Sequence, residues 1–272
     1  MNHSIYQADY WDEIQGGVCV SDWNSTLYLK FKKERTQPAA DLAARLRTYN
    51  PEKIADIGCG PGNSTAVLRS VFPKAELCGI DASQNMIEKA RQEHPELKFI
   101  LCDINDIGSG YDLFFSNACL QWVPDHIRLL PRLMQKLNAG GVLAVQMPMN
   151  QEEPLYRIIA EITGASEWGF PKTCFEGNSV LSPDEYYDIL SECSADFQIW
   201  ETVYCHALPS HQALVDWAKS TRLRPYLDAL DDEKAALLES EILHGVQEAY
   251  PVRRSGNVLL HFRRFFFTAV RQ

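Results

Sequence analysis

The chain has 272 residues, which is long enough to bury a sizeable core in one elaborated domain or two small ones. Hydrophobic residues make up 46% of the sequence and charged residues 23%, as in globular proteins, which argues against a disordered chain. The formal net charge of −10 at pH 7 argues against a nucleic-acid partner and against an anionic membrane, and a small anionic substrate would need a local basic pocket.

The cysteines and the N-terminal residues indicate the cellular compartment of the protein. No two of the eight cysteines are spaced C-x-x-C, so we expect no metal site of the zinc-ribbon type. Residues 1–20 carry Asp9, Asp12 and Glu13 and contain no apolar run of signal-peptide length. No stretch of the sequence is apolar enough to cross a membrane as a helix. These features predict a cytoplasmic location with reduced cysteines.

Residues 1–20 show no clear periodicity and are interpreted as an N-terminal extension. From Ile54 onward, apolar runs of strand length alternate with segments of helical character. The strand-like runs read KIADIG, AELCGID, KFILCD, YDLFFSN and GGVLAVQM. They are nearly continuous in apolar residues, as strands buried on both faces must be. This order predicts a parallel sheet that helices cover on both faces.

Several helix starts are marked by capping residues. Ser83 and Ser182 precede helical patterns as N-caps, Pro183 occupies a first helical position, and a further helix is expected from Asp125. Residues 210–250 predict two or three helices, and the final run VLLHFRRFFFTAV predicts a long terminal strand. We expect residues 21–150 to form the core with a lid at its N-terminal end and residues 151–195 to form an insertion or cap. Residues 196–272 are expected to be the C-terminal part of the same domain, with a helical cap and terminal antiparallel strands.

The segment from Asp56 to Asn63 reads DIGCGPGN and joins a predicted strand to a predicted helix. Its glycines allow a sharp turn and let a ligand approach the backbone closely. An acid, Asp81, closes the next strand, where it is placed to bind the two hydroxyls of a ribose. Another acid, Asp103, closes the third strand. The pattern predicts a nucleotide-like cofactor at the carboxyl edge of the sheet.

This order of acid, glycines and two further acids resembles the Rossmann-like methyltransferases that use S-adenosylmethionine. The resemblance implies a mostly parallel seven-stranded sheet with an added helical cap, and S-adenosylhomocysteine as the product. It also implies that the glycine loop meets the methionine end of the cofactor, that Asp81 holds the ribose and that Asp103 meets the adenine. The cofactor-binding residues expected on this basis are Asp56, Gly58, Gly60, Asp81, Met86, Asp103 and Asn117. For Met86, a place in the core of its helix is an equal alternative.

The fourth strand is followed by the motif Asn117-Ala-Cys-Leu-Gln121-Trp122. The end of this strand lies on the ligand side of an open parallel sheet. Asn117 and Gln121 are therefore expected to orient the cofactor or the substrate, although no residue is assigned as a catalytic group. We interpret Trp122 as a packed indole.

Further motifs, many of them away from the cofactor loop, resemble the trans-aconitate 2-methyltransferase family from Ser21 to the C-terminus. They include NACLQWVPDH, PSHQALVDW and LRPYL. The resemblance implies methyl transfer to a carboxylate of a small polycarboxylic acid. Arg222 stands where the family pattern has glycine, which leaves the identity of the acid open.

A carboxylate is ionised at neutral pH, so it needs no general base to attack a methyl group. Its reaction depends on orientation, while the other carboxylates of the substrate need fixed donors such as arginine side chains. The candidates for substrate binding are Tyr28, Arg35, Tyr204, His206, Arg222 and Arg224. For each of them alone, a solvated or ion-paired surface role is an alternative.

Other functions remain open at this point. One is a methyltransferase for another acid, an amine or a carbon centre, and another is a module that binds S-adenosylmethionine without catalysis. An NAD-dependent oxidoreductase is disfavoured by the G-x-G-x-G spacing and by Asp103. The sequence does not fix the oligomeric state, and a monomer is compatible with it.

Overall fold

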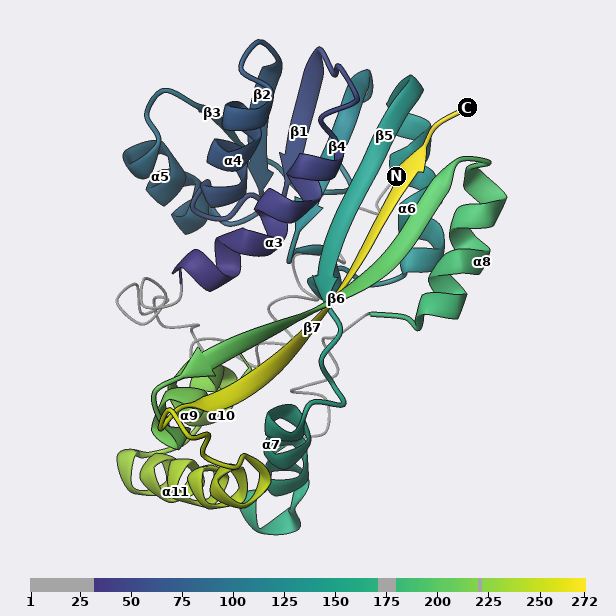
Figure 1. Cartoon of the computed structure of the whole chain (residues 1–272). Coiled ribbons are helices and arrows are strands. Elements are labelled where there is room, and N and C mark those ends of the chain that lie inside the picture. Colours follow the sequence, from purple (N-terminus) through teal and green to yellow (C-terminus); the bar gives the residue numbers. More distant parts are fainter. Residues whose placement is uncertain (1–31, 171–179, 220–221) are drawn as a thin grey trace, which may run out of the picture. The chain divides into compact units, whose positions relative to one another are not determined.

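The computed structural model describes residues 32–170, 180–219 and 222–272. The described residues divide into two compact units (Figure 1). The first, here called the sheet unit, comprises residues 33–149, 180–203 and 263–272. The second, here called the helical unit, comprises residues 150–170, 204–219 and 222–262.

The strands form one seven-stranded sheet in the order β3-β2-β1-β4-β5-β7-β6. Its strands are β1 (Lys53–Ile57), β2 (Glu76–Asp81), β3 (Lys98–Leu101), β4 (Tyr111–Asn117), β5 (Leu137–Pro148), β6 (Phe197–Leu208) and β7 (Val258–Val270). The first five pair with one another in parallel, and β7 pairs antiparallel with β5. The predicted mostly parallel sheet of a Rossmann-like fold is confirmed. The far ends of β6 and β7 belong to the helical unit.

Helices cover both faces of the sheet, as the sequence predicts. The helices of the sheet unit are α3 (Lys32–Arg45), α4 (Asn63–Val71), α5 (Gln84–Glu93), the short η1 (Leu120–Trp122), α6 (His126–Lys136) and α8 (Pro183–Cys193). On one face, Leu130 of α6 and Leu190 of α8 share a buried cluster with Ile57, Ile80 and Val145. Helix α5 packs against β2 and β3, and α4 packs against β2.

Alternate residues of each strand point to opposite faces of the sheet. Val145 and Met147 of β5, like Phe265 and Phe267 of β7, belong to the cluster beneath α6 and α8. Gln146 lies between two of these residues and is fully buried on the other face. The near-continuous apolar runs in the sequence follow from this burial on both sides.

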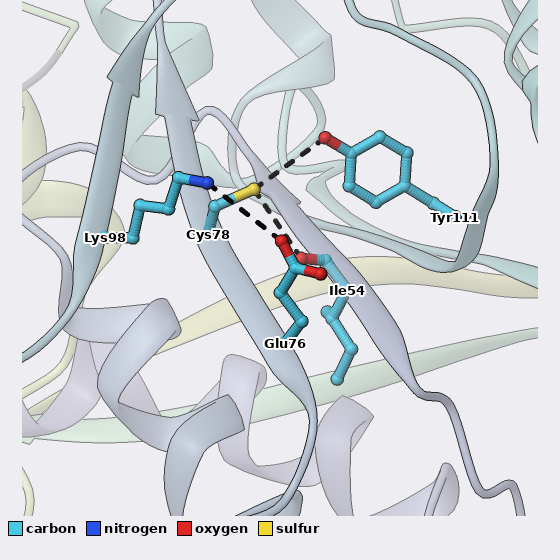
Figure 2. A network of polar contacts seen from close by, with 5 residues as sticks. All are labelled: Ile54, Glu76, Cys78, Lys98 and Tyr111. Carbon is cyan, nitrogen blue, oxygen red and sulfur yellow. Dashed lines mark hydrogen bonds and ion pairs between the residues drawn. The ribbon is translucent and has the colours of Figure 1, made fainter.

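The amino-terminal edge of the sheet carries a small polar network, drawn in Figure 2. The thiol of Cys78 lies 3.9 Å from the hydroxyl of Tyr111 and donates to the carbonyl of Ile54 at 3.7 Å. Beside them, Lys98 Nζ lies 4.0 Å from Glu76 Oε1. Burial raises the pKa of Tyr111 to about 12, so the phenol stays neutral at neutral pH.

The predicted helix caps are confirmed. The side chain of Ser83 accepts the backbone N–H of Met86 at the start of α5. Ser182 and Glu185 form a capping box at the start of α8, with Pro183 at the first helical position. Asp125 caps α6 and accepts the N–H of Arg128.

The helical unit has its own core. Its helices are α7 (Pro154–Gly164), the short η2 (Ser166–Trp168), α9 (His211–Lys219), α10 (Arg224–Asp228) and α11 (Asp232–Ala249). The last three confirm the helices predicted in residues 210–250. Helix α11 packs against α7 and α9, and Trp217 is buried near Phe262 at a ring distance of 5.5 Å.

The predicted terminal strand is confirmed as β7, whereas the sequence analysis did not single out β6. Nearly all residues of β6 are half-buried or exposed, so its sequence FQIWETVYCHAL lacks the strong apolar signal of the inner strands. Among the described helices, none combines the length and apolar character needed to cross a membrane. In the same part of the chain, no group of three histidine, cysteine or acidic side chains is placed to hold a metal ion.

Candidate functional site

The glycine loop between β1 and α4 adopts the turn that its sequence requires. Gly58, Gly60 and Gly62 have φ values of 71°, 53° and 90°, a region that disfavours side chains with a Cβ atom. The N–H of Gly58 donates to the carbonyl of Ile80 at 2.7 Å and ties the loop to β2. Gly62 then caps α4, so the loop leads directly into the positive end of a helix.

Two of these glycines differ in their surroundings. A Cβ atom on Gly58 would overlap the side chain of Cys119, which follows β4. Apart from its two chain neighbours, a Cβ atom on Gly60 would meet no atom of the described residues within 4 Å. Gly58 is therefore required for packing, while Gly60 borders open space that a ligand can enter.

Asp81, at the end of β2, joins the loop to the next helix. Its Oδ2 accepts the N–H of Gly60 at 2.9 Å, and its Oδ1 accepts the N–H of Ser83 at 2.9 Å. The carboxylate is only partly buried. Each oxygen keeps a further lone pair, so the group can also accept hydrogen bonds from ligand hydroxyls.

Asp56 precedes the loop and is fully buried. Its Oδ2 accepts hydrogen bonds from Ser64 Oγ at 2.7 Å and Thr65 Oγ1 at 2.6 Å, and its Oδ1 has no partner within residues 32–170, 180–219 and 222–272. Burial raises the pKa of Asp56 to about 6, with a smaller contribution from the charge of Asp81, although the two hydroxyl donors oppose the shift. The carboxyl thus holds the first turn of α4 behind the loop.

The other predicted cofactor residues lie at the same edge of the sheet unit. Met86 is half-buried in the first turn of α5. Asp103 follows β3, where its Oδ1 accepts the N–H of Asn105 at 2.8 Å. Asn117 is the last residue of β4, and its buried Oδ1 has no hydrogen-bond partner in the described part of the chain.

Gln121 and Trp122 follow β4 in η1. Gln121 Nε2 donates to the carbonyl of Ala118 at 2.8 Å, and its buried Oε1 accepts no hydrogen bond from any of the described residues. Ala118 itself has a φ of 55°, an unusual value for a residue with a Cβ atom that bends the chain just after the strand. The interpretation of Trp122 as a packed indole is wrong, because 49% of the residue is exposed. The turn of η1 directs this side chain outward and buries Leu120 and Gln121 instead.

A buried arginine was missed by the sequence analysis. Arg264 of β7 is 5% exposed, and its Nη1 donates to Gln146 Oε1 of β5 at 3.4 Å. The strand contains two consecutive arginines, and because a strand alternates between its faces, one of them had to point toward the buried side. Arg263 is the exposed one, with its Nη1 3.8 Å from Glu201 Oε1.

The predicted substrate residues do not all fall within one compact unit. Tyr28 lies outside the described residues, and Arg35 lies in α3 of the sheet unit. The others belong to the helical unit and are Tyr204, His206, Arg222 and Arg224. The rings of Tyr204 and His206 stack at 6.3 Å, and Arg224 Nε donates to Asp228 Oδ2 at 2.8 Å within α10.

Comparisons with known proteins agree with this geometry. A family model described as a methyltransferase domain matches residues 50–215. The chain is 44% identical over 254 residues to a trans-aconitate 2-methyltransferase of Escherichia coli K12, which covers 93% of this chain and 99% of that protein. An equally similar protein of the same name is known from Shigella flexneri.

Solved structures are similar in fold. The YcgJ protein of Bacillus subtilis gives a TM-score of 0.57 at 12% identity and covers 87% of this chain and 99% of its own. The plantazolicin methyltransferase BpumL in complex with SAH gives a TM-score of 0.51 at 16% identity and covers 97% of this chain and 99% of its own.

Proposed function

The chain belongs to the trans-aconitate 2-methyltransferase family. From this premise we propose that it methylates a carboxylate of a small polycarboxylic acid, with trans-aconitate as the preferred substrate. S-adenosylmethionine would supply the methyl group. The observation that carries the proposal is the open space at Gly60 beside the carboxylate of Asp81, at the carboxyl edge of the sheet. This edge is where open parallel sheets bind their ligands.

The residues at this edge fit the cofactor. When bound, S-adenosylmethionine would provide an electrophilic methyl group on a positively charged sulfur. We expect the backbone at Gly58 and Gly60 to hold its methionine end, and Asp81 to accept its ribose hydroxyls. Asp103 is assigned to the adenine, beside Met86. The unpartnered Oδ1 of Asn117 suits the amino group of the cofactor, because a buried acceptor needs a donor.

The proposed reaction requires no general base from the protein. The carboxylate that receives the methyl group is already ionised at neutral pH, so no side chain has to remove a proton. The residues of the chain would contribute by orienting the acid and by excluding water from its reacting oxygen. Asn117 and Gln121 are assigned this positioning role.

The residues predicted to bind substrate stay a proposal, as do the cytoplasmic location and the domain boundaries given above. An arginine is the preferred donor for a spectator carboxylate because its planar fork matches the two oxygens. Arg224 already donates from Nε to one carboxylate oxygen, Asp228 Oδ2, at 2.8 Å. Tyr28, Arg35, Tyr204, His206 and Arg222 complete the set.

The activity is tested by transfer of labelled methyl from S-adenosylmethionine to a panel of di- and tricarboxylic acids. We expect labelled, base-labile ester from trans-aconitate at a higher kcat/KM than from any dicarboxylate. Label transferred only to an amine or a carbon centre would favour the alternative function, a methyltransferase that acts on such a group. Cofactor binding with no transfer to any small molecule would favour the non-catalytic module.

Asp81→Ala is expected to weaken binding of S-adenosylhomocysteine roughly ten- to a hundredfold, the effect of losing a charge-assisted hydrogen bond. Isothermal calorimetry measures the dissociation constant. Glu76→Ala is the matched control, because Glu76 begins the same strand and lies at its opposite end. Unchanged affinity of the Asp81 variant would remove this residue from the cofactor site.

Arg224→Lys is expected to lower kcat/KM for the tricarboxylic acid roughly ten- to a hundredfold, because lysine offers a point charge in place of a fork. The affinity for S-adenosylhomocysteine should stay the same. Arg222→Lys serves as the comparison and should have a smaller effect, since the family pattern lacks this arginine. If Arg224→Lys changes only the melting temperature, its bond with Asp228 is structural.

A further inference from the structure

A buried histidine links the segment after β4 to α8 in the sheet unit. His126 is the first residue of α6 and is 2% exposed. Its ring Nε2 lies 2.8 Å from the carbonyl oxygen of Leu120, and its Nδ1 lies 2.6 Å from the hydroxyl of Tyr186. Leu120 begins the short helix η1, while Tyr186 belongs to α8, which packs against α6. Both ring nitrogens are therefore held, each by a different element.

The partners of His126 determine where its hydrogens lie. A backbone carbonyl can only accept a hydrogen bond, so Nε2 carries a hydrogen and donates it to Leu120. Burial lowers the pKa of the imidazole, although the carbonyls of Leu120 and Val123 and the charge of Asp125 oppose the shift. In the resulting neutral ring, Nδ1 is an acceptor, and the hydroxyl of Tyr186 donates to it.

Tyr186 is a rigid support for this ring. The tyrosine is fully buried and stacks on Phe265 with ring centroids 4.9 Å apart. Its hydroxyl oxygen accepts the backbone N–H of Leu181 at 3.3 Å. Met147 Sδ lies 3.7 Å from the hydroxyl, but a thioether is a weaker acceptor than an imidazole nitrogen. The phenol thus holds His126 in one orientation and one tautomer.

The carbonyl that His126 holds belongs to residues 117–123, here called the β4–α6 turn. Asn117 and Gln121 flank Leu120 in this turn. Each has a buried side-chain oxygen that accepts no hydrogen bond from the residues described by the structure. Gln121 is itself anchored within the turn, because its Nε2 donates to the carbonyl of Ala118 at 2.8 Å. A contact that fixes the Leu120 carbonyl therefore also fixes the direction of these two oxygens.

We propose that His126, supported by Tyr186, is a positioning residue for methyl transfer and acts through the carbonyl of Leu120. It holds the β4–α6 turn so that Asn117 and Gln121 keep their places beside the reacting groups. The inference rests on the proposed function and extends it to two residues outside the predicted cofactor and substrate sets. A misplacement of about 1 Å can lower the rate of a reaction about a hundredfold, so a single buried hydrogen bond can matter for turnover.

The test uses two amide side chains that each reproduce one ring nitrogen. In His126→Gln the amide reaches the place of Nε2 and can donate to Leu120, whereas in His126→Asn it reaches only the place of Nδ1. We expect kcat for trans-aconitate, at saturating S-adenosylmethionine, to fall roughly ten- to a hundredfold in His126→Asn and less than about threefold in His126→Gln. The melting temperature should fall in both variants, so a purely structural role would not produce this difference.

Tyr186→Phe tests the support of the imidazole. It should lower kcat less than His126→Asn does and add no further loss to that variant, because the phenol acts only through the ring. Ser194→Ala is the matched control at the other end of α8. Ser194 is 4% exposed, and its hydroxyl lies 2.8 Å from the carbonyls of both Asp196 and Val270. Its loss should lower the melting temperature and leave kcat unchanged.

Amide hydrogen exchange reports on the β4–α6 turn independently of activity. The N–H groups of Trp122 and Val123 bond within the turn, to the carbonyls of Cys119 and Leu120. We expect these two amides to exchange faster in His126→Asn than in the unmodified protein, and at an unchanged rate in His126→Gln.

Equal losses of kcat in the two His126 variants, or a loss in His126→Asn no larger than in Ser194→Ala, would overturn the positioning role while the proposed function stands. The proposed function fails by a different result, in which the unmodified protein transfers no methyl group to any polycarboxylic acid. In that case the exchange measurement still decides the role of His126, because unchanged exchange in His126→Asn contradicts it.

Discussion

Gly58→Ala is expected to destabilise the protein more than any other single change in the glycine loop. The residue has a φ of 71°, where a side chain costs about 1–2 kcal/mol. The added Cβ would also overlap the side chain of Cys119, and overpacking of a filled site typically costs a further ~1–3 kcal/mol. Both effects act on a protein whose total stability is of the order of 5–15 kcal/mol.

Gly60→Ala is the matched variant, because its φ is 53° and a Cβ atom there has no contact within 4 Å among the residues that the structure describes. We expect its free energy of unfolding to fall only by the cost of a side chain at this positive φ, about 1–2 kcal/mol. Its Cβ would enter the space assigned to the cofactor, so the affinity for S-adenosylhomocysteine should fall although the fold persists. Urea denaturation and calorimetry measure the two effects separately.

The double variant Gly58→Ala/Cys119→Gly separates backbone strain from overlap. Removing the Cys119 side chain should recover the packing part of the loss and leave the loss due to φ. If Gly58→Ala proves no less stable than Gly60→Ala, the close approach between the loop and the segment after β4 is wrong.

Asp56→Asn is expected to change how stability depends on pH. Burial raises the pKa of the Asp56 carboxyl to about 6 from an ordinary value of 3.8. Below the ordinary value, both the folded and the unfolded chain hold this proton. Between the two values the folded chain binds more protons, so the contribution of Asp56 to stability falls as pH rises and is lost above pH 6. A shift of about two pKa units corresponds to about 3 kcal/mol.

The asparagine variant has no such proton. The free energy of unfolding of Asp56→Asn, minus that of the unmodified protein, should therefore rise by about 2.5 kcal/mol between pH 4 and pH 7.5. Taking this difference removes the contributions of other titrating groups, such as Asp112. Burial would raise the pKa of Asp112, but hydrogen bonds from Asn138 and from the backbone N–H groups of Lys53 and Glu52 lower it overall. Urea denaturation of the protein without cofactor, at several pH values, provides the measurement. A difference that does not vary with pH would mean that Asp56 titrates normally.

The sequence by itself determined the parts of the protein that depend on residues close together in the chain. The apolar runs predicted the inner strands, and Ser83 and Ser182 predicted the starts of α5 and α8. The loop at Gly58 and the acid Asp81 predicted the ligand edge of the sheet, because strand ends and glycine turns are local features. The relation to known methyltransferase sequences added the chemistry.

Only the tertiary structure decided which of these residues become neighbours. Gln146 and Arg264 are 118 positions apart and meet because β7 pairs with β5. The contact of Gly58 with the segment after β4, and the exposure of Trp122, also depend on how distant segments pack. Periodicity reveals that one of two adjacent arginines in a strand faces inward, but the choice between them is fixed by the register of the sheet, because a shift of one residue exchanges the two faces.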